Sequence, residues 1–158
     1  MRQHSATLLS LAAIFASLAA TSLSSCGEDR VEPGNVERGH QIATSTKCNF
    51  CHQVEGRGGM IAPPMDKALS LANELVRDYE KRVENLKVAA PKAYTAAQPT
   101  IDAILAEKNQ ARRFEMWLNG YLVDTKFDNP MTKMGNVLLT AQQRADVIAW
   151  LATQRPGQ

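Results

Sequence analysis

The stretch CNFCH, residues 48–52, holds two cysteines separated by two residues, with a histidine directly after the second cysteine. Three kinds of chemistry use such a pattern: a metal site, a redox-active dithiol and the covalent attachment of a haem. The chain has 158 residues and one further cysteine, Cys26. The choice among the three therefore depends on the partner residues that the rest of the sequence supplies.

The N-terminus has the pattern of an export signal. Residues 8–20 form an apolar run that follows Arg2 and is too short to span a bilayer of about 30 Å. The stretch LSSC, residues 23–26, resembles a bacterial lipobox, which implies cleavage before Cys26 and lipid attachment to its thiol; the alternative is an ordinary signal peptide. We expect a lipoprotein signal peptide over residues 1–25, a tether over 26–34 and a location on the periplasmic side of a bacterial membrane.

The residues around CNFCH favour haem over the other two chemistries. A structural zinc ion takes four ligands, but the sequence after the leader has no second cysteine pair and only one other histidine, His40. A thioredoxin-like dithiol needs a β-α-β frame, and the flanking sequence has a helix and loop pattern. Two thiols three positions apart can add to the two vinyl groups on one edge of a porphyrin, which places His52 beneath the iron. The sequence predicts one haem c, covalently bound through Cys48 and Cys51.

Both ends of the exported chain resemble one family. Residues 36–66, VERGHQIATSTKCNFCHQVEGRGGMIAPPMD, are similar to the N-terminal half of a class I c-type cytochrome, and residues 129–154, NPMTKMGNVLLTAQQRADVIAWLATQ, are similar to its C-terminal end. The resemblance implies a small all-α domain over residues 35–158 that wraps one haem, with its first and last helices crossing. It also implies that Trp150 packs on the first helix.

Local signals at both ends agree with helices. Asn35 can cap a helix that begins at Val36, and Thr140 with Gln143 forms a capping box. Gly39 lies inside the first helix, where it costs about 1 kcal/mol relative to alanine. This cost indicates that another element approaches closely there.

The iron's second axial ligand is expected to be a methionine thioether. A histidine and methionine pair is usual for electron-transfer haems and raises the reduction potential. By resemblance the ligand follows a proline by four residues, which selects Met134 after Pro130 and leaves Met131 as the alternative. The resemblance further implies that the Pro63 carbonyl accepts the N–H of the His52 ring. The remaining methionines after the leader are Met60, Met65 and Met116.

The middle of the chain departs from the family pattern. Residues 66–112 are longer than a compact cytochrome of this class needs, and we expect an inserted helical hairpin that covers the haem or forms a docking surface. Apolar residues at alternating spacings of four and three predict one amphipathic helix over residues 67–89. Pro91 and Pro99 predict a loop between them. A second helix is expected from near Thr100, either continuous with the next apolar segment or broken near Asn109.

Four further side chains are candidates for secondary roles. Arg112 and Arg113 are considered as partners of a haem propionate, since a buried propionate needs a cationic or hydrogen-bonding neighbour. Arg57 and Trp117 are comparable candidates. His40 is not expected to be a ligand, because it lies on the N-terminal helix.

The sequence therefore predicts a membrane-anchored electron carrier that exchanges single electrons with redox proteins. A fixed cytochrome subunit of a larger respiratory or dehydrogenase complex is the alternative, and a haem sensor or peroxidase-like enzyme is a third possibility that lacks a spare distal histidine. The formal net charge is +2 and no basic stripe is present, so we expect no nucleic-acid partner.

Overall fold

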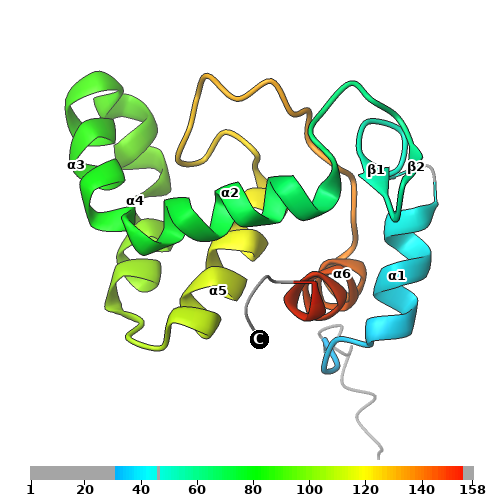
Figure 1. Cartoon of the computed structure of the whole chain (residues 1–158). Helices are drawn as coiled ribbons and strands as arrows, with labels where there is room; N and C mark the ends of the chain where they lie inside the picture. Colours follow the sequence, from blue (N-terminus) through cyan, green and yellow to red (C-terminus); the bar gives the residue numbers. More distant parts are fainter. Residues whose placement is uncertain (1–30, 46, 155–158) are drawn as a thin grey trace, which may run out of the picture. The chain divides into compact units, whose positions relative to one another are not determined.

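The computed structural model describes residues 31–45 and 47–154, which form six helices and one short hairpin (Figure 1). The expected signal peptide and Cys26 lie outside these residues. The elements are α1 (Val36–Thr44), β1 (Gln53–Val54), β2 (Arg57–Gly58), α2 (Met65–Arg77), α3 (Tyr79–Ala89), α4 (Pro91–Ala106), α5 (Gln110–Val123) and α6 (Ala141–Thr153). The fold class is all-α, as the sequence predicts.

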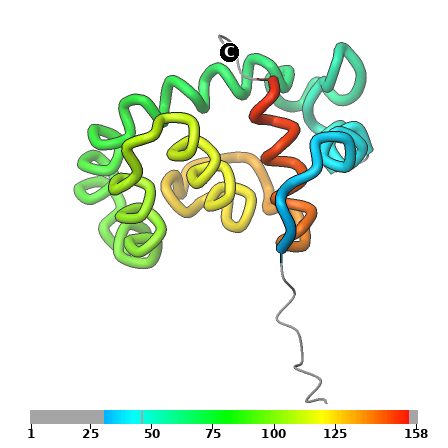
Figure 2. Tube along the Cα trace, turned by 90° about the horizontal axis from the view of Figure 1, so that it is seen from below, coloured from blue at the N-terminus to red at the C-terminus, as the bar shows by residue number. Residues whose placement is uncertain are grey.

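The first and last helices pack side by side, as Figure 2 shows for α1 in blue and α6 in red. The Asn35 side chain caps α1 by accepting from the Arg38 N–H, and Thr140 and Gln143 form the expected capping box of α6. A Cβ atom at Gly39 would fall on the Asp146 carbonyl and against Trp150. Glycine at this position therefore permits the close approach of the two helices. This confirms the prediction made from its unfavourable position inside a helix.

Part of the expected tether belongs to the helical domain. The Glu32 N–H donates to the Gln142 side chain at 2.7 Å, and the Gln142 amide donates back to the Glu32 carbonyl at 3.3 Å. Gly34 lies so close to α6 that a Cβ atom would overlap the Ala145 carbonyl. Residues 31–34 thus run along α6 before α1 begins.

A two-stranded hairpin follows the CNFCH stretch, and the sequence did not predict it. Gln53 pairs with Gly58 and Val54 with Arg57 in antiparallel register. The two turn residues, Glu55 and Gly56, both have positive φ angles of 53° and 76°. A type I′ turn requires positive φ angles at both central residues, and its backbone twist matches the twist of the two strands that it joins.

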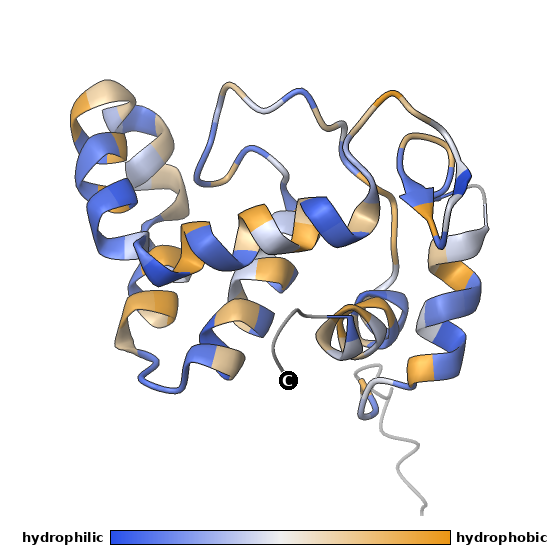
Figure 3. Ribbon diagram, viewed as in Figure 1, coloured by the Kyte–Doolittle hydropathy of each residue, from blue (hydrophilic) through white to orange (hydrophobic). Residues whose placement is uncertain are grey.

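The predicted single helix over residues 67–89 is wrong, because the chain bends at Asp78 and forms two helices, α2 and α3. Val76 and Tyr79 on either side of the bend are both fully buried. The four-and-three spacing of the apolar residues continues through the bend, so periodicity alone could not reveal it. Figure 3 shows hydrophobic and hydrophilic residues alternating along α2.

The predicted loop over residues 91–99 is also wrong, since α4 runs from Pro91 to Ala106. Pro91 occupies the first turn, where its fixed φ angle suits a helix. Pro99 lies inside the helix, which ordinarily costs about 3 kcal/mol. The complete burial of Ile101 and near-complete burial of Ile104 on the next turn offset that cost. Residues 66–112 therefore hold most of three helices, α2, α3 and α4, instead of a simple hairpin, and α3 and α4 pack against each other (Figure 1).

The break near Asn109 is confirmed, because the Asn109 side chain caps α5 by accepting from the Arg112 N–H at 3.0 Å. α5 supplies a central part of the core, with Phe114, Trp117 and Leu118 buried. Among the described residues, none of the helices is both long and apolar enough to cross a membrane.

Candidate haem site

Residues 48–52 form one tight turn that places the reactive groups together. The His52 and Cys51 N–H groups both bond to the Cys48 carbonyl, at 3.0 and 3.2 Å. This is the hydrogen-bonding pattern of a helical turn, in which positions i, i+3 and i+4 lie on one side. Cys48, Cys51 and His52 occupy those three positions. The two thiols are free of disulfide bonding.

The His52 ring is held by the loop that leads into α2. Its Nδ1 atom lies 2.7 Å from the Pro63 carbonyl oxygen, which is the contact that the family resemblance implies. When Nδ1 carries the proton and donates it to this carbonyl, Nε2 presents a lone pair that can bind a metal ion. The carbonyl thus orients the ring and increases its strength as a ligand.

The β hairpin and the loop after it are tied to the back of the same turn. The Gly59 N–H donates to the Asn49 carbonyl at 2.8 Å, and the Ala62 N–H donates to the Cys51 carbonyl at 3.0 Å. A Cβ atom at Gly58 would overlap Asn49, and one at Gly59 would overlap the Phe50 carbonyl. The two glycines therefore let the hairpin lie close enough to place Pro63 beneath His52.

The surroundings of the turn suit a large, flat, apolar group. Ile61, beside the Ala62 contact, and Leu138, whose carbonyl accepts from the Lys47 ammonium at 3.2 Å, are both largely exposed. Burial raises the pKa of the Cys48 thiol. Two thiols, an oriented imidazole and uncovered aliphatic side chains fit a covalently bound porphyrin. Within the described residues no group of three or more histidine, cysteine or acidic side chains is arranged to hold a metal ion, so they do not offer a four-ligand zinc site.

The segment between α5 and α6 carries both candidate methionine ligands. Met134 is half-buried, while Met131 is 83% exposed and lines a groove against α2 and α3. The Thr125 hydroxyl lies 2.9 Å from the Met134 carbonyl and 2.8 Å from the Asn136 side-chain oxygen, so its one proton can serve either acceptor. The Asn136 oxygen also accepts the Thr125 N–H at 3.1 Å. These contacts fix the backbone at Met134. The Met131 N–H donates to the Asn129 side-chain oxygen at 3.2 Å, so the two methionines differ mainly in side-chain exposure.

Three of the side chains considered for propionate contact have protein partners instead. Arg113 is buried between Glu80, at 3.0 Å, and the Glu107 carbonyl, at 2.9 Å. Arg112 lies 3.4 Å from a Glu107 carboxylate oxygen. The Trp117 ring N–H donates to Asp128 at 2.7 Å. Arg57 is exposed on β2.

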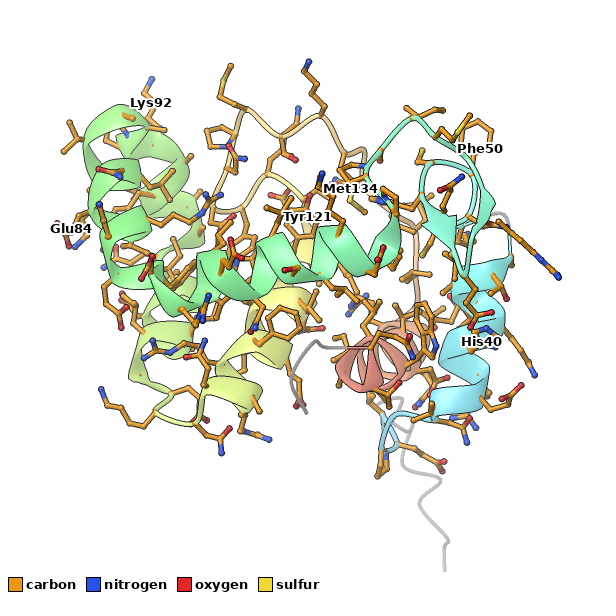
Figure 4. The ribbon with its side chains drawn as sticks, viewed as in Figure 1. His40, Phe50, Glu84, Lys92, Tyr121 and Met134 are labelled. Atoms are coloured by element: carbon orange, nitrogen blue, oxygen red, sulfur yellow. The ribbon has the colours of Figure 1, made fainter. Side chains whose placement is uncertain are left out.

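His40 is placed on α1, away from Met134, as Figure 4 shows. Its Nε2 atom lies 3.0 Å from a Glu55 carboxylate oxygen, and its ring lies against Trp150 with centroids 5.7 Å apart. These contacts join α1 to the β hairpin and to α6. His40 therefore has a structural place in the fold.

Sequence reasoning missed three residues that shape the site. Thr125 and Asp128 are both buried in the segment that carries Met134, and Lys47 ties the CNFCH turn to Leu138. A buried polar residue in a loop leaves little periodic signal. The only available indication was the crowding of Asp124, Asp128 and Asn129 with Thr125 between α5 and Pro130.

An all-helical domain with a thiol, thiol and imidazole on one turn defines a covalent haem protein. A family model described as Cytochrome c matches residues 36–155, and the chain belongs to the cytochrome c family. It is therefore a haem c electron-transfer protein, with haem c attached through Cys48 and Cys51. No match was found among curated proteins or among solved structures.

Proposed function

We propose that this cytochrome is a membrane-anchored carrier of single electrons in which His52 and Met134 are the axial ligands. The observation that carries the proposal is the 2.7 Å contact between His52 Nδ1 and the Pro63 carbonyl, because it leaves Nε2 of the ring for the iron. Haem c, when bound, supplies an iron that alternates between the ferric and ferrous states. The chain's own residues attach it, orient its ligands and limit water access.

The choice of Met134 over Met131 is supported by the difference in their exposure, since Met131 is 83% exposed. The Met134 backbone is bonded through Thr125, and its side chain is half-buried. Tyr121 of α5 contacts the same segment, because its hydroxyl lies 3.3 Å from the Thr132 hydroxyl, two residues before Met134. A thioether that must stay within bonding distance of iron requires a backbone with few alternative positions.

The ligands are tested by the weak near-infrared sulfur-to-iron band of the ferric protein. We expect Met134→Ala to lose this band and Met131→Ala to retain it. The reverse result would assign the ligand to Met131. A carbon monoxide titration of the reduced wild type tests the carrier function, because a firmly held sixth ligand prevents an adduct at neutral pH and a sensor would form one.

Membrane attachment rests on the lipobox-like sequence before Cys26, and on the physical argument that several acyl chains give durable anchoring. Expression of wild type and Cys26→Ser in a bacterial host with a lipoprotein pathway tests it. We expect the wild type in the detergent phase with an acylated N-terminal peptide by mass spectrometry. The variant is expected in the aqueous phase with its haem intact. A wild-type protein without acylation would contradict the anchor while leaving electron transfer unaffected.

A further inference from the structure

A buried carboxylate lies at the start of the segment that carries Met134. The Asp128 side chain is 1% exposed, and its Oδ2 atom accepts the Trp117 ring N–H at 2.7 Å. Only one cationic side chain, Arg82, is bonded to it among the described residues, at 3.2 and 3.4 Å. A buried carboxylate is costly unless it is paired and hydrogen-bonded.

The cationic partner comes from the inserted segment. Arg82 lies on α3, one turn after Tyr79, whose buried hydroxyl has no hydrogen-bond partner among the described residues and interacts electrostatically with the same carboxylate. Burial, and then the Asp128 carboxylate, raise the pKa of the Tyr79 hydroxyl. The phenol is therefore neutral beside the ion pair. Through Arg82 and Trp117, α3 and α5 both bond to this carboxylate at the start of the Met134 segment.

The contacts continue from Asp128 toward Met134. Trp117 stacks on Tyr121 with ring centroids 4.9 Å apart and planes 17° from parallel. The Tyr121 hydroxyl lies 3.3 Å from the Thr132 hydroxyl, two residues before Met134. The Thr132 N–H donates to the Asn129 carbonyl at 3.0 Å, which closes a turn directly after Asp128. The segment is thus held at its start by Asp128 and near Met134 by Tyr121.

We propose that Asp128 is a positioning residue for the sixth iron ligand, and that Arg82 and Trp117 hold it, so that the inserted helix α3 sets how firmly Met134 binds the iron. The proposal rests on the proposed function, because it takes Met134 as that ligand. Residues 66–112 would then affect how firmly the sixth ligand binds the iron, in addition to any contact that they make with partner proteins.

Imidazole binding to the ferric holoprotein tests this, because imidazole must displace the methionine to reach the iron. We expect Asp128→Asn and Trp117→Phe to bind imidazole about tenfold more tightly than the wild type, since loss of a hydrogen bond to a charged group changes an equilibrium constant by about that factor. Trp117→Phe keeps an aromatic ring but removes the N–H donor together with part of the ring volume, and it carries the test if Asp128→Asn does not fold.

Glu80→Gln is the matched control. It removes the other ion pair between α3 and α5, which does not reach the Met134 segment. We expect it to leave imidazole affinity unchanged. The proposal is overturned if both Asp128→Asn and Trp117→Phe bind imidazole as the wild type does while unfolding at lower denaturant, because Asp128 would then be only structural.

Met134→Ala separates this proposal from the ligand assignment. It should bind imidazole most tightly of all, because no thioether competes. If Met134→Ala binds imidazole as the wild type does, the ligand assignment fails and the positioning role fails with it. If Met134→Ala is the only variant that binds imidazole more tightly than the wild type, the ligand assignment stands and the positioning role alone is wrong.

Discussion

Arg38 of α1 and Asp146 of α6 form a two-pronged ion pair, with Nε to Oδ2 at 2.9 Å and Nη2 to Oδ1 at 3.0 Å. The Asp146 side chain is 3% exposed and also accepts from the Asn35 N–H at 2.8 Å and the Gln142 amide at 3.1 Å. One carboxylate therefore joins the start of α1 to the middle of α6. Gly39 permits α1 and α6 to cross closely because it has no side chain. The Arg38–Asp146 ion pair holds the two helices in register.

Asp146→Asn should lower the free energy of unfolding of the holoprotein by about 1–3 kcal/mol, the range for a buried hydrogen-bonding group that loses its partner. Denaturant unfolding followed by circular dichroism measures the change. Glu37→Gln is the control, because Glu37 is an exposed acid in the first turn of α1. Equal losses in the two variants would contradict a special role for the buried carboxylate.

The same pair predicts a pH dependence. The hydrogen bond from Arg38 is the main cause that lowers the pKa of Asp146 from 3.8 to about 2. Because the folded-state pKa lies below the unfolded one, the stabilisation is fully present above about pH 4 and is lost as the pH falls through about 2. The difference in stability between wild type and Asp146→Asn should therefore shrink over this interval. A difference that stays constant down to pH 2 would show that charge at Asp146 contributes little.

Gly39→Ala should destabilise the protein by about 1–3 kcal/mol, the usual cost of forcing extra volume into a packed site. The new methyl would overlap the Asp146 carbonyl and contact Trp150. Alanine is the better helix former by about 1 kcal/mol, so a net loss can come only from packing. Gly135→Ala is the control, because nothing lies within 4 Å of its added Cβ. Thermal unfolding of the holoproteins measures the change. A Gly39→Ala variant that is more stable than the wild type would contradict the close approach of the two helices.

Thr125→Val should weaken the sulfur-to-iron band and lower stability by about 1 kcal/mol, because it removes the hydroxyl proton available to the Met134 carbonyl while keeping the side-chain shape. The Thr125 hydroxyl contacts both the Met134 carbonyl and the Asn136 oxygen. Thr125→Ser keeps the hydroxyl and should restore most of the band. If both variants lose the band equally, the methyl group matters and the hydrogen bond does not.

Cysteine substitutions should separate the two thioether bonds. Cys48→Ala and Cys51→Ala are each expected to keep haem on the denatured chain through the remaining thiol. The double variant is expected to lose haem on denaturation. Haem staining of denaturing gels and peptide mass spectrometry measure this. Cys26→Ser is the control and should carry both bonds.

The haem chemistry of this protein is readable from five consecutive residues, because Cys48, Cys51 and His52 act together on a single turn. The capping residues Asn35 and Thr140 were also readable, since each bonds to a backbone N–H within three residues. Gly39 signalled the helix crossing by its poor helix propensity. Such features depend on neighbours in the chain, which the sequence displays directly.

Tertiary structure decided the rest. The bend at Asp78 leaves the apolar spacing unchanged, so only the packing of Val76 and Tyr79 reveals it. Asp128 appears in the sequence as one more loop carboxylate, yet it meets Arg82 across 46 positions of chain. Asp146 likewise meets Arg38 across 108 positions. The sequence by itself determined which group this protein binds, because attachment is local. How firmly its second ligand is held depends on contacts between distant segments, and those exist only once the helices have packed.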